Sequence, residues 1–362
     1  MDWQSDANAT KTTFAPTLER WYARHKRDLP WRYTTDPYRI WLSEVILQQT
    51  RVAQGMPYYL RFTEAYPTVA DMARADERDL LRLWQGLGYY SRARNLHQTA
   101  RYINEQLNGQ FPDTFADLLK LKGIGVYTAA AIASFAFGER VPVVDGNVYR
   151  VLARVFGITD DITTTGARKT FAALAHELIQ PAADPATYNQ AIMEFGAIQC
   201  TPVSPDCLLC PLQQACVAFQ TGRQQQLPVK ARKAPVRERF FNYLVFRQGN
   251  RLALRERTGR DIWQNLHEFW LQETDEPADS LRALVLPEPV AQLVAQGRPA
   301  GPAVPAVQLL SHQRIRAMFH LIDLPEGWIG TLPDGLNWFS TAEINQLPKP
   351  VLITGYWSQL FG

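Results

Sequence analysis

The chain has 362 residues, 46% of them hydrophobic, and a formal net charge of +3. This length predicts two domains, and the small net charge is compatible with nucleic-acid binding without indicating it. The N-terminal stretch lacks the basic start and apolar core of a signal peptide. The longest run of small and apolar residues, 129–137, is far shorter than the roughly 20 residues of a membrane helix. We therefore expect a soluble, cytoplasmic protein.

The first half of the chain has helical periodicity. From about residue 15 to 220, apolar residues recur at spacings of three and four, with repeated helix start and stop signals. Asp36-Pro37 is expected to open one helix as N-cap and first-turn proline, and Phe111-Pro112-Asp113 to open another. Strand signals are almost absent here. We predict a mainly α-helical domain over residues 1–220.

Within this domain, two helical patterns in residues 113–137 are joined by Leu121-Lys122-Gly123-Ile124-Gly125. The two glycines allow a tight turn close to a phosphate, and free amides at the start of the second helix would bind that anion. This would be a DNA grip that does not depend on base sequence. An ordinary helical hairpin with a glycine turn explains the pattern equally well.

All four cysteines of the chain lie in one short segment with the spacing C-x6-C-x2-C-x5-C: Cys200, Cys207, Cys210 and Cys216. Zinc modules usually have two C-x2-C pairs a dozen or more residues apart, whereas this segment has one. The spacing therefore favours an iron–sulfur cluster over zinc. Buried free cysteines fit less well, because three nearby prolines predict an irregular loop. We predict a [4Fe-4S] cluster with a structural role.

The remainder of the chain is different in character. Residues 221–236 contain prolines, glutamines and basic residues without apolar periodicity, which predicts a basic linker. Residues 239–247 and 251–257 alternate around Gln248-Gly249-Asn250, a pattern typical of a β-hairpin, and residues 314–324 predict another strand. We expect a second domain of mixed α and β structure over residues 237–362.

The hairpin, the following segment 144–148 (VDGNV) and the cysteine loop occur in an order that resembles the helix-hairpin-helix DNA glycosylases of the endonuclease III superfamily. Residues 29–32 (LPWR), 43–50 (SEVILQQT) and 86–95 (GLGYYSRARN) support this resemblance. Within the superfamily, the chain is similar to MutY-type adenine DNA glycosylases over essentially its whole length. The resemblance implies base excision repair and a C-terminal domain similar to a Nudix fold.

One position separates the subfamilies. In bifunctional relatives, a lysine two residues after the second hairpin glycine attacks the sugar to form a Schiff base. This chain has Tyr127 there, so the resemblance implies a monofunctional enzyme, although Lys122 stands where the family often has proline. Two alternatives stay open: a bifunctional glycosylase and lyase for oxidised pyrimidines, and a catalytically silent iron–sulfur DNA-binding protein.

Excision of adenine requires protonation of the departing base and stabilisation of a sugar with oxocarbenium character. Glu44 shares a helix face with Ile40, Trp41 and Leu47, so we expect a desolvated carboxyl with a raised pKa that acts as general acid. A glutamate on a helix is usually a solvated surface residue, and the family match carries this assignment. The resemblance implies that Asp145 stays ionised and stabilises the sugar, and it could also cap a helix.

The resemblance also assigns the other site residues. Tyr127 and Asn147 would orient the sugar, the water and the carboxylate. The pocket for the flipped-out adenine would contain Trp31, Arg32 and Gln190. Contacts to DNA and to the lesion would come from Gln49, Thr50, Leu87, Tyr89, Lys122, Gly123, Gly125, Ser311 and His312.

A Nudix hydrolase holds its metal with an R-E-x2-E-E cluster, and no such cluster follows residue 237. We predict that the C-terminal domain kept the fold and lost hydrolysis. The resemblance implies that it reads 8-oxoguanine through Leu310-Ser311-His312, where the family has Phe-Ser-His, while a plain turn is the alternative. The implied partner is double-stranded DNA with 8-oxoguanine:adenine or guanine:adenine mispairs. It would be bound by a monomer, located at the nucleoid if the source is bacterial.

Overall fold

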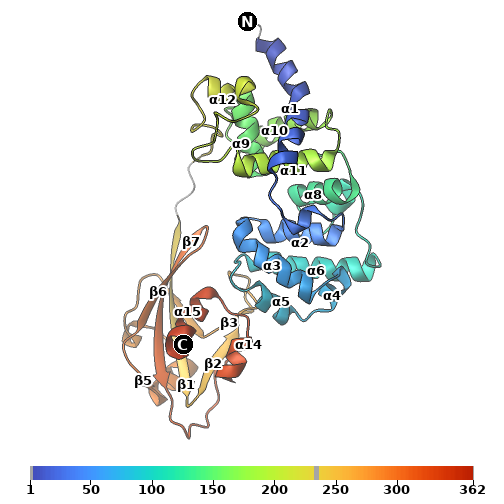
Figure 1. Ribbon diagram of the computed structural model, residues 1–362. Helices are drawn as coiled ribbons and strands as arrows, with labels where there is room; N and C mark the ends of the chain where they lie inside the picture. The colour runs from blue at the N-terminus through green and yellow to red at the C-terminus, as the bar shows by residue number, and fades with distance from the viewer. Residues whose placement is uncertain (1–2, 232–235, 362) are drawn as a thin grey trace. The chain divides into compact units, whose positions relative to one another are not determined.

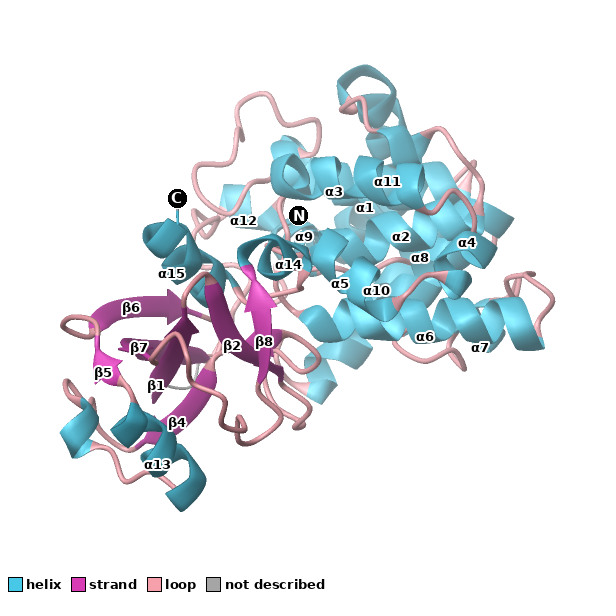
Figure 2. Cartoon of the chain, turned by 90° about the horizontal axis from the view of Figure 1, so that it is seen from below, coloured by secondary structure: helices cyan, strands magenta, loops and turns pink. Residues whose placement is uncertain are grey.

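The computed structural model describes residues 3–231 and 236–361. The chain forms two compact units, the first from Met1–Arg74 and Asn95–Arg232, the second from Ala75–Arg94 and Lys233–Gly362. In the described residues, all strands belong to the second unit, and the first contains helices and loops (Figures 1 and 2). The predicted fold class, a helical N-terminal part followed by an α+β part, is confirmed. None of the described helices is long and apolar enough to cross a membrane.

The helical segments up to residue 220 alternate with short loops. In chain order they are α1 (Trp3–His25), η1 (Pro30–Arg32), α2 (Pro37–Leu47), α3 (Val52–Ala65), α4 (Val69–Arg74), α5 (Glu77–Trp84), α6 (Tyr90–Gln106), α7 (Phe115–Leu118), α8 (Val126–Phe137), α9 (Gly146–Phe156), α10 (Thr165–Ile179), α11 (Pro185–Ile198), η2 (Gln213–Ala215) and α12 (Val217–Gln220).

Capping residues set the helix starts. The Asp36 side chain accepts a hydrogen bond from the Tyr38 amide at 2.9 Å, with Pro37 in the first turn, so that predicted start is confirmed. The predicted start at Phe111-Pro112-Asp113 is wrong, because α7 begins at Phe115 with Thr114 as N-cap. The Thr114 hydroxyl accepts from the amide of Asp117 at 3.2 Å, so the capping side chain, and not the upstream proline, fixes this boundary.

The main core of the first unit lies among α1, α9, α10 and α11. Phe14, Leu152, Phe171 and Phe195 on these four helices are at most 1% exposed. On α9, apolar residues at positions 148, 151, 152 and 155 form one buried stripe at helical spacing. This packing holds the start of α9, where the predicted carboxylate Asp145 stands.

The second unit contains a mixed β-sheet followed by helices. Its elements beyond residue 236 are β1 (Arg237–Gln248), β2 (Arg251–Glu256), β3 (His267–Glu268), β4 (Trp270–Thr274), η3 (Leu281–Ala283), α13 (Glu288–Gln296), β5 (Arg298–Pro299), β6 (Val304–Leu309), β7 (Gln313–Asp323), β8 (Asn337–Ser340), α14 (Thr341–Gln346) and α15 (Val351–Phe361).

The central strand β1 pairs in parallel with β7 and antiparallel with β2 and β4. Strands β5 and β6 both pair antiparallel with β7, and β8 pairs with β2. In the predicted hairpin, Gln248 faces Arg251 and Gly249 has a φ of 55°, as a two-residue turn requires. This hairpin and the predicted strand at 314–324 are confirmed. The likeness to a Nudix fold stays a resemblance.

Two segments differ from the division expected from sequence. Residues 221–231 of the predicted linker pack on the first unit: Leu227 is 3% exposed, and its carbonyl accepts from Arg154 Nε at 3.1 Å. Residues 232–235, with Arg232 and Lys233 of the predicted basic linker, lie outside the described residues. Ala75–Arg94 groups with the second unit, where Asn265 Nδ2 donates to Glu77 at 2.6 Å. Such contacts between distant segments leave no local pattern in the sequence.

Candidate active site

The candidate general acid Glu44 is buried on α2. Glu44 is 6% exposed, and Tyr127 Oη on α8 donates a hydrogen bond to Glu44 Oε2. The pKa of Glu44 is raised to about 7: burial has the largest effect and raises it, the Tyr127 hydrogen bond lowers it, the Asp145 charge raises it and the Arg32 charge lowers it. The expected burial and raised pKa are therefore present. A carboxyl with this pKa can hold a proton near neutral pH and release it to a base.

The second carboxyl, Asp145, caps the N-terminus of α9. Its Oδ1 accepts from the Val148 amide at 2.8 Å and its Oδ2 from Asn147 Nδ2 at 2.7 Å. Burial raises the pKa of Asp145 above its ordinary value, and these hydrogen bonds and Arg150 offset only part of that rise. Two donors and the helix N-terminus favour the ionised form. Both the N-cap role and a candidate catalytic role therefore apply to Asp145.

Arg150, which was not predicted as a site residue, holds the Asn147 side chain that donates to Asp145. Its Nη2 donates to Asn147 Oδ1 at 2.8 Å and to the Gly196 carbonyl at 2.6 Å, and its Nε donates to the Cys200 carbonyl at 2.8 Å. The i,i+3 spacing from Asn147 was the signal that could have found it. The same guanidinium thus contacts the Asp145 neighbour and the start of the cysteine loop.

Arg32 of the predicted adenine pocket and Arg27, which was not predicted, both contact a carboxylate that was also missed, Glu194 on α11. Arg32 Nη2 and Arg27 Nη2 each lie 2.6 Å from Glu194 Oε2. Burial alone would raise the pKa of Glu194, but the hydrogen bonds from both arginines outweigh it and lower the pKa to about 2. Glu194 lies one helical turn after Gln190, and that i,i+4 spacing was its available signal. Gln190 itself accepts from Tyr22 Oη at 2.6 Å.

One pocket of the first unit unites most of the predicted catalytic and adenine-binding residues. It is lined by Trp31, Arg32, Glu44, Thr50, Tyr127, Asp145, Asn147 and Gln190, together with the unpredicted Arg27, Arg150 and Glu194. Gln49 is not among its lining residues. It is exposed, in a left-handed backbone conformation with a φ of 56°, next to Thr50. The pocket therefore brings two carboxyl groups, Glu44 and Asp145, together with several polar side chains.

The predicted DNA-binding hairpin forms a separate exposed turn. Lys122, Gly123 and Gly125 are all exposed, and Lys122 Nζ donates to Gln98 at 2.5 Å. Gly123 has a φ of 75°, and a Cβ there would stand 2.7 Å from the Cβ of Asn95, so this position requires glycine. Gly125 precedes α8 as its N-cap. The first amides of α8 thus lie beside an exposed turn, where an anion could bind.

The other predicted lesion contacts line a pocket of the second unit. This pocket contains Leu87, Tyr89, Ser311 and His312, and Tyr89 Oη is hydrogen-bonded to Ser311 Oγ. Tyr89 is 39% exposed, whereas Leu87 is 6% exposed. Of these two residues, both predicted to contact DNA, Tyr89 is therefore the more accessible.

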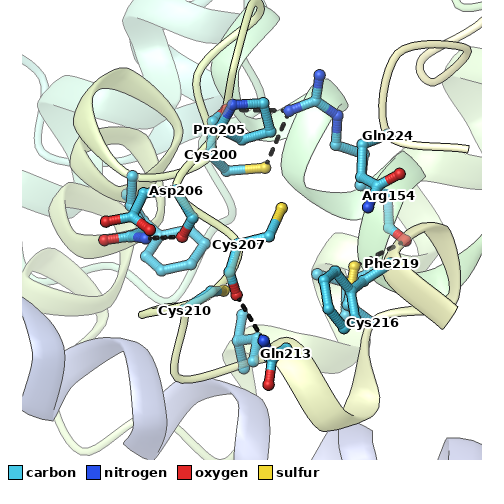
Figure 3. A pocket seen from close by; sticks show the side chains of 14 residues that line it. Arg154, Cys200, Pro205, Asp206, Cys207, Cys210, Gln213, Cys216, Phe219 and Gln224 are labelled. Carbon is cyan, nitrogen blue, oxygen red and sulfur yellow. Dashed lines mark hydrogen bonds between the residues drawn. The ribbon is translucent and has the colours of Figure 1, made fainter. Parts of the chain in front are cut away.

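The four cysteines line one pocket of the first unit, close to α9 (Figure 3). All are free, and Arg154 contacts two of them: its Nη1 donates to Cys200 Sγ at 3.4 Å, and its carbonyl accepts from Cys216 Sγ at 3.4 Å. Burial raises the pKa of Cys210 to about 12, so a thiolate there would need a bound cation. The donor set is thus four convergent thiols in a site of low polarity.

The spacing of these thiols bears on the kind of metal. Among the described residues, no group of three or more Cys, His, Asp or Glu is close enough to hold a single metal ion. One zinc ion would need its sulfurs within about 4 Å of one another, given Zn–S bonds of about 2.3 Å. In a [4Fe-4S] cluster each thiolate binds a different iron, so the sulfurs stand further apart. Four cysteine thiols that line one pocket are a donor set that fits a [4Fe-4S] cluster.

Known DNA repair proteins are similar to this chain. Residues 42–177 match the model of the HhH-GPD superfamily base excision DNA repair protein. The adenine DNA glycosylase of Buchnera aphidicola subsp. Schizaphis graminum is 37% identical over 257 residues, 71% of this chain and 74% of that protein. The adenine DNA glycosylase of Homo sapiens is 45% identical over 228 residues, 60% of this chain and 42% of that protein.

The helical architecture also has a counterpart among solved structures. A thermostable thymine-DNA glycosylase is similar with a TM-score of 0.55 at 28% identity, covering 59% of this chain and 99% of that protein. The matched superfamily region runs from α2 to α10 and includes Glu44, Tyr127 and Asp145. The chain therefore belongs to the adenine DNA glycosylases of the HhH-GPD superfamily of base excision repair proteins.

Proposed function

We propose that this adenine DNA glycosylase acts as a monomer on double-stranded DNA, at the nucleoid if the source is bacterial. Its substrates are adenines paired with 8-oxoguanine or guanine. The observation that carries the proposal is one pocket that is lined by Asp145 and by Glu44, whose pKa is about 7, together with polar side chains. A base held there meets an acid that is partly protonated at neutral pH.

The two carboxyls divide the chemistry. Glu44 gives its proton to a ring nitrogen of adenine as the bond from the base to the sugar breaks, and the electron pair of that bond leaves with the base. The Asp145 carboxylate, fixed by Asn147 and the α9 amides, stabilises the positive sugar. Water then adds to the sugar and returns a proton to Glu44. Tyr127 keeps the Glu44 carboxyl oriented throughout.

Strand cleavage is not part of this activity, because Tyr127 cannot form a Schiff base with the sugar. Borohydride added during turnover should therefore trap little covalent protein–DNA adduct. Efficient trapping would favour the bifunctional alternative instead.

Four cysteines would hold a [4Fe-4S] cluster: Cys200, Cys207, Cys210 and Cys216. The bound cluster would cross-link the loop after α11 and would take no part in the excision. The fit of four convergent thiols supports this proposal. Purified protein should contain about four irons and four sulfides per chain by elemental and sulfide analysis. Cys210→Ser should lose most of this iron, whereas zinc as the bound metal would contradict the proposal.

Lesion choice is assigned to Ser311 and His312, which are exposed and line the same pocket as Tyr89. The decisive experiment measures adenine release from matched duplexes with 8-oxoguanine, guanine, cytosine or thymine opposite adenine. We expect fastest release opposite 8-oxoguanine, and a smaller preference in the Ser311→Ala variant because one hydrogen bond to the lesion is lost. Equal release from all duplexes, or release from thymine:adenine pairs, would refute the assigned specificity.

A further inference from the structure

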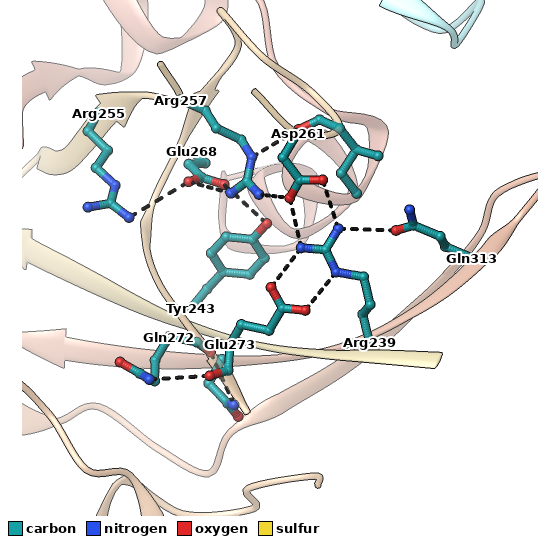
Figure 4. Close-up of polar contacts among 11 residues, drawn as sticks. Arg239, Tyr243, Arg255, Arg257, Asp261, Glu268, Gln272, Glu273 and Gln313 are labelled. Carbon is teal, nitrogen blue, oxygen red and sulfur yellow. Dashed lines mark hydrogen bonds and ion pairs between the residues drawn. The ribbon is translucent and has the colours of Figure 1, made fainter. Parts of the chain in front are cut away.

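An ionic cluster around one buried arginine lies in the second unit (Figure 4). Its centre is Arg239 on β1, which is 7% exposed. The Nε and Nη2 of Arg239 donate to Glu273 at 2.6 Å each, and Nη1 and Nη2 donate to Asp261 at 3.0 and 2.7 Å. A second arginine, Arg257, donates to Asp261 at 2.6 Å.

The fifth N–H of the Arg239 guanidinium is directed at Gln313. Arg239 Nη1 donates to Gln313 Oε1 at 3.1 Å. All five N–H groups of this guanidinium therefore have acceptors, so its orientation is fixed on every side. Such a group can position whatever it binds, and Gln313 is its only uncharged partner among the described residues.

Gln313 is the last residue of the turn formed by residues 310–313, which we call the lesion-reading turn. Strand β6 ends at Leu309 and β7 begins at Gln313, and the Leu310 amide donates to the Gln313 carbonyl at 2.8 Å. Ser311 and His312 are thus carried between two residues whose backbone is closed into a turn. The Gln313 side chain connects this turn to the ionic cluster.

The cluster also supplies a second lining residue of the same pocket. Asp261, which accepts hydrogen bonds from both arginines, lines the pocket together with Ser311 and His312. Displacement of Arg239 would therefore affect both the turn and Asp261. Resting on the function proposed above, we propose that Arg239, through Gln313 and Asp261, is a positioning residue for recognition of 8-oxoguanine by the lesion-reading turn.

Gln313 is the position at which this inference can be tested without disrupting the fold. Removal of Arg239 would leave Asp261 and Glu273 without their shared cation, which is strongly destabilising. Gln313→Ala removes one neutral acceptor at a half-buried position and leaves both ion pairs in place. Gln313→Glu retains an acceptor for Arg239. Gln272→Ala is the matched control, because Gln272 is a half-buried glutamine of β4 that donates to the Glu273 carbonyl and does not contact Arg239.

The experiment measures single-turnover adenine release opposite 8-oxoguanine and opposite guanine for the four proteins, with their thermal unfolding. Gln313→Ala should lower the ratio of the two rates by roughly threefold to tenfold, as loss of part of one charge-assisted hydrogen bond predicts. Gln313→Glu and Gln272→Ala should keep the wild-type ratio. Any loss of DNA affinity from the added charge of Gln313→Glu is common to both duplexes and cancels.

A wild-type ratio in Gln313→Ala would overturn the inference and leave the proposed function intact. A wild-type enzyme without preference for 8-oxoguanine would overturn the proposed specificity, and this inference with it. A reduced ratio in Gln313→Ala that Gln313→Glu fails to restore would show that the hydrogen bond to Arg239 is not the cause. Thermal unfolding identifies a general loss of stability, which would lower both rates and leave their ratio unchanged.

Discussion

Carboxyl groups of the two units differ in pKa, and their hydrogen-bond partners decide what they can do. Glu44 in the first unit accepts from a neutral phenol, and burial raises its pKa to about 7. Asp261 in the second unit accepts from two guanidinium groups, which outweigh the effect of burial and hold its pKa well below the usual range. A neutral donor leaves the carboxyl able to carry a proton, whereas two cations keep it ionised.

Glu194 shows that this contrast depends on partners and not on the unit in which the carboxyl lies. It lines the same pocket as Glu44, but hydrogen bonds from Arg27 and Arg32 lower its pKa to about 2. The pocket therefore contains a carboxyl suited to proton transfer and one suited to holding cations in place. Substitutions of each should have different signatures.

The largest effect is expected for Glu44→Gln. The amide keeps the shape of the side chain but cannot supply a proton, so adenine release should fall at least about 100-fold. Affinity for the mispaired duplex should stay near the wild-type value, measured by equilibrium binding. Full activity in this variant would rule out Glu44 as the acid.

A smaller effect, on both excision rate and stability, is expected for Glu194→Gln. Arg27 and Arg32 would lose their shared counter-ion, so we expect excision to fall roughly tenfold and unfolding free energy to fall by about 3 kcal/mol. Single-turnover kinetics and denaturant unfolding measure the two effects. The matched control is Glu177→Gln, which removes an exposed partner of Lys11 and should change stability by less than about 1 kcal/mol.

The pH dependence tests the pKa of Glu44 directly. In the proposed mechanism the protonated form of Glu44 is the active one, and its pKa is raised to about 7. Above that pH the rate of excision should fall about tenfold per pH unit, because the protonated fraction falls by that factor. A rate of the chemical step that stays constant from pH 7 to 9 would contradict this prediction.

The smallest effect is expected for Tyr127→Phe, which sharpens the role of the neutral donor. The Tyr127 hydrogen bond lowers the pKa of Glu44, so its loss should raise that pKa and move the alkaline limb of the pH–rate profile to higher pH. The maximal rate should decrease only a few-fold, because orientation of the acid is lost while its proton remains. An unshifted profile would show that the phenol does not act on the acid.

Several features of this chain could be predicted from local sequence alone. Helical periodicity up to residue 220, the Asp36-Pro37 start and the hairpin at Gly249 depend on neighbours in the chain, and the structure confirms them. The assignment as a glycosylase of adenine rested on motif order and is confirmed by the relatives. The burial of Glu44 followed from the apolar residues on its own helix face.

Tertiary structure decided the partners of these residues, since ion pairs between distant segments leave no periodic signal. Arg27 and Arg32 meet Glu194 across more than 160 positions, and Arg239 meets Gln313 across 74. The sequence could place carboxyls and arginines on helices and strands, but not say which carboxyl would be neutralised. The pKa of each carboxyl depends on which cations the fold brings within hydrogen-bonding distance. This difference in partners separates Glu44, the proposed acid, from the carboxylates that are paired with arginines.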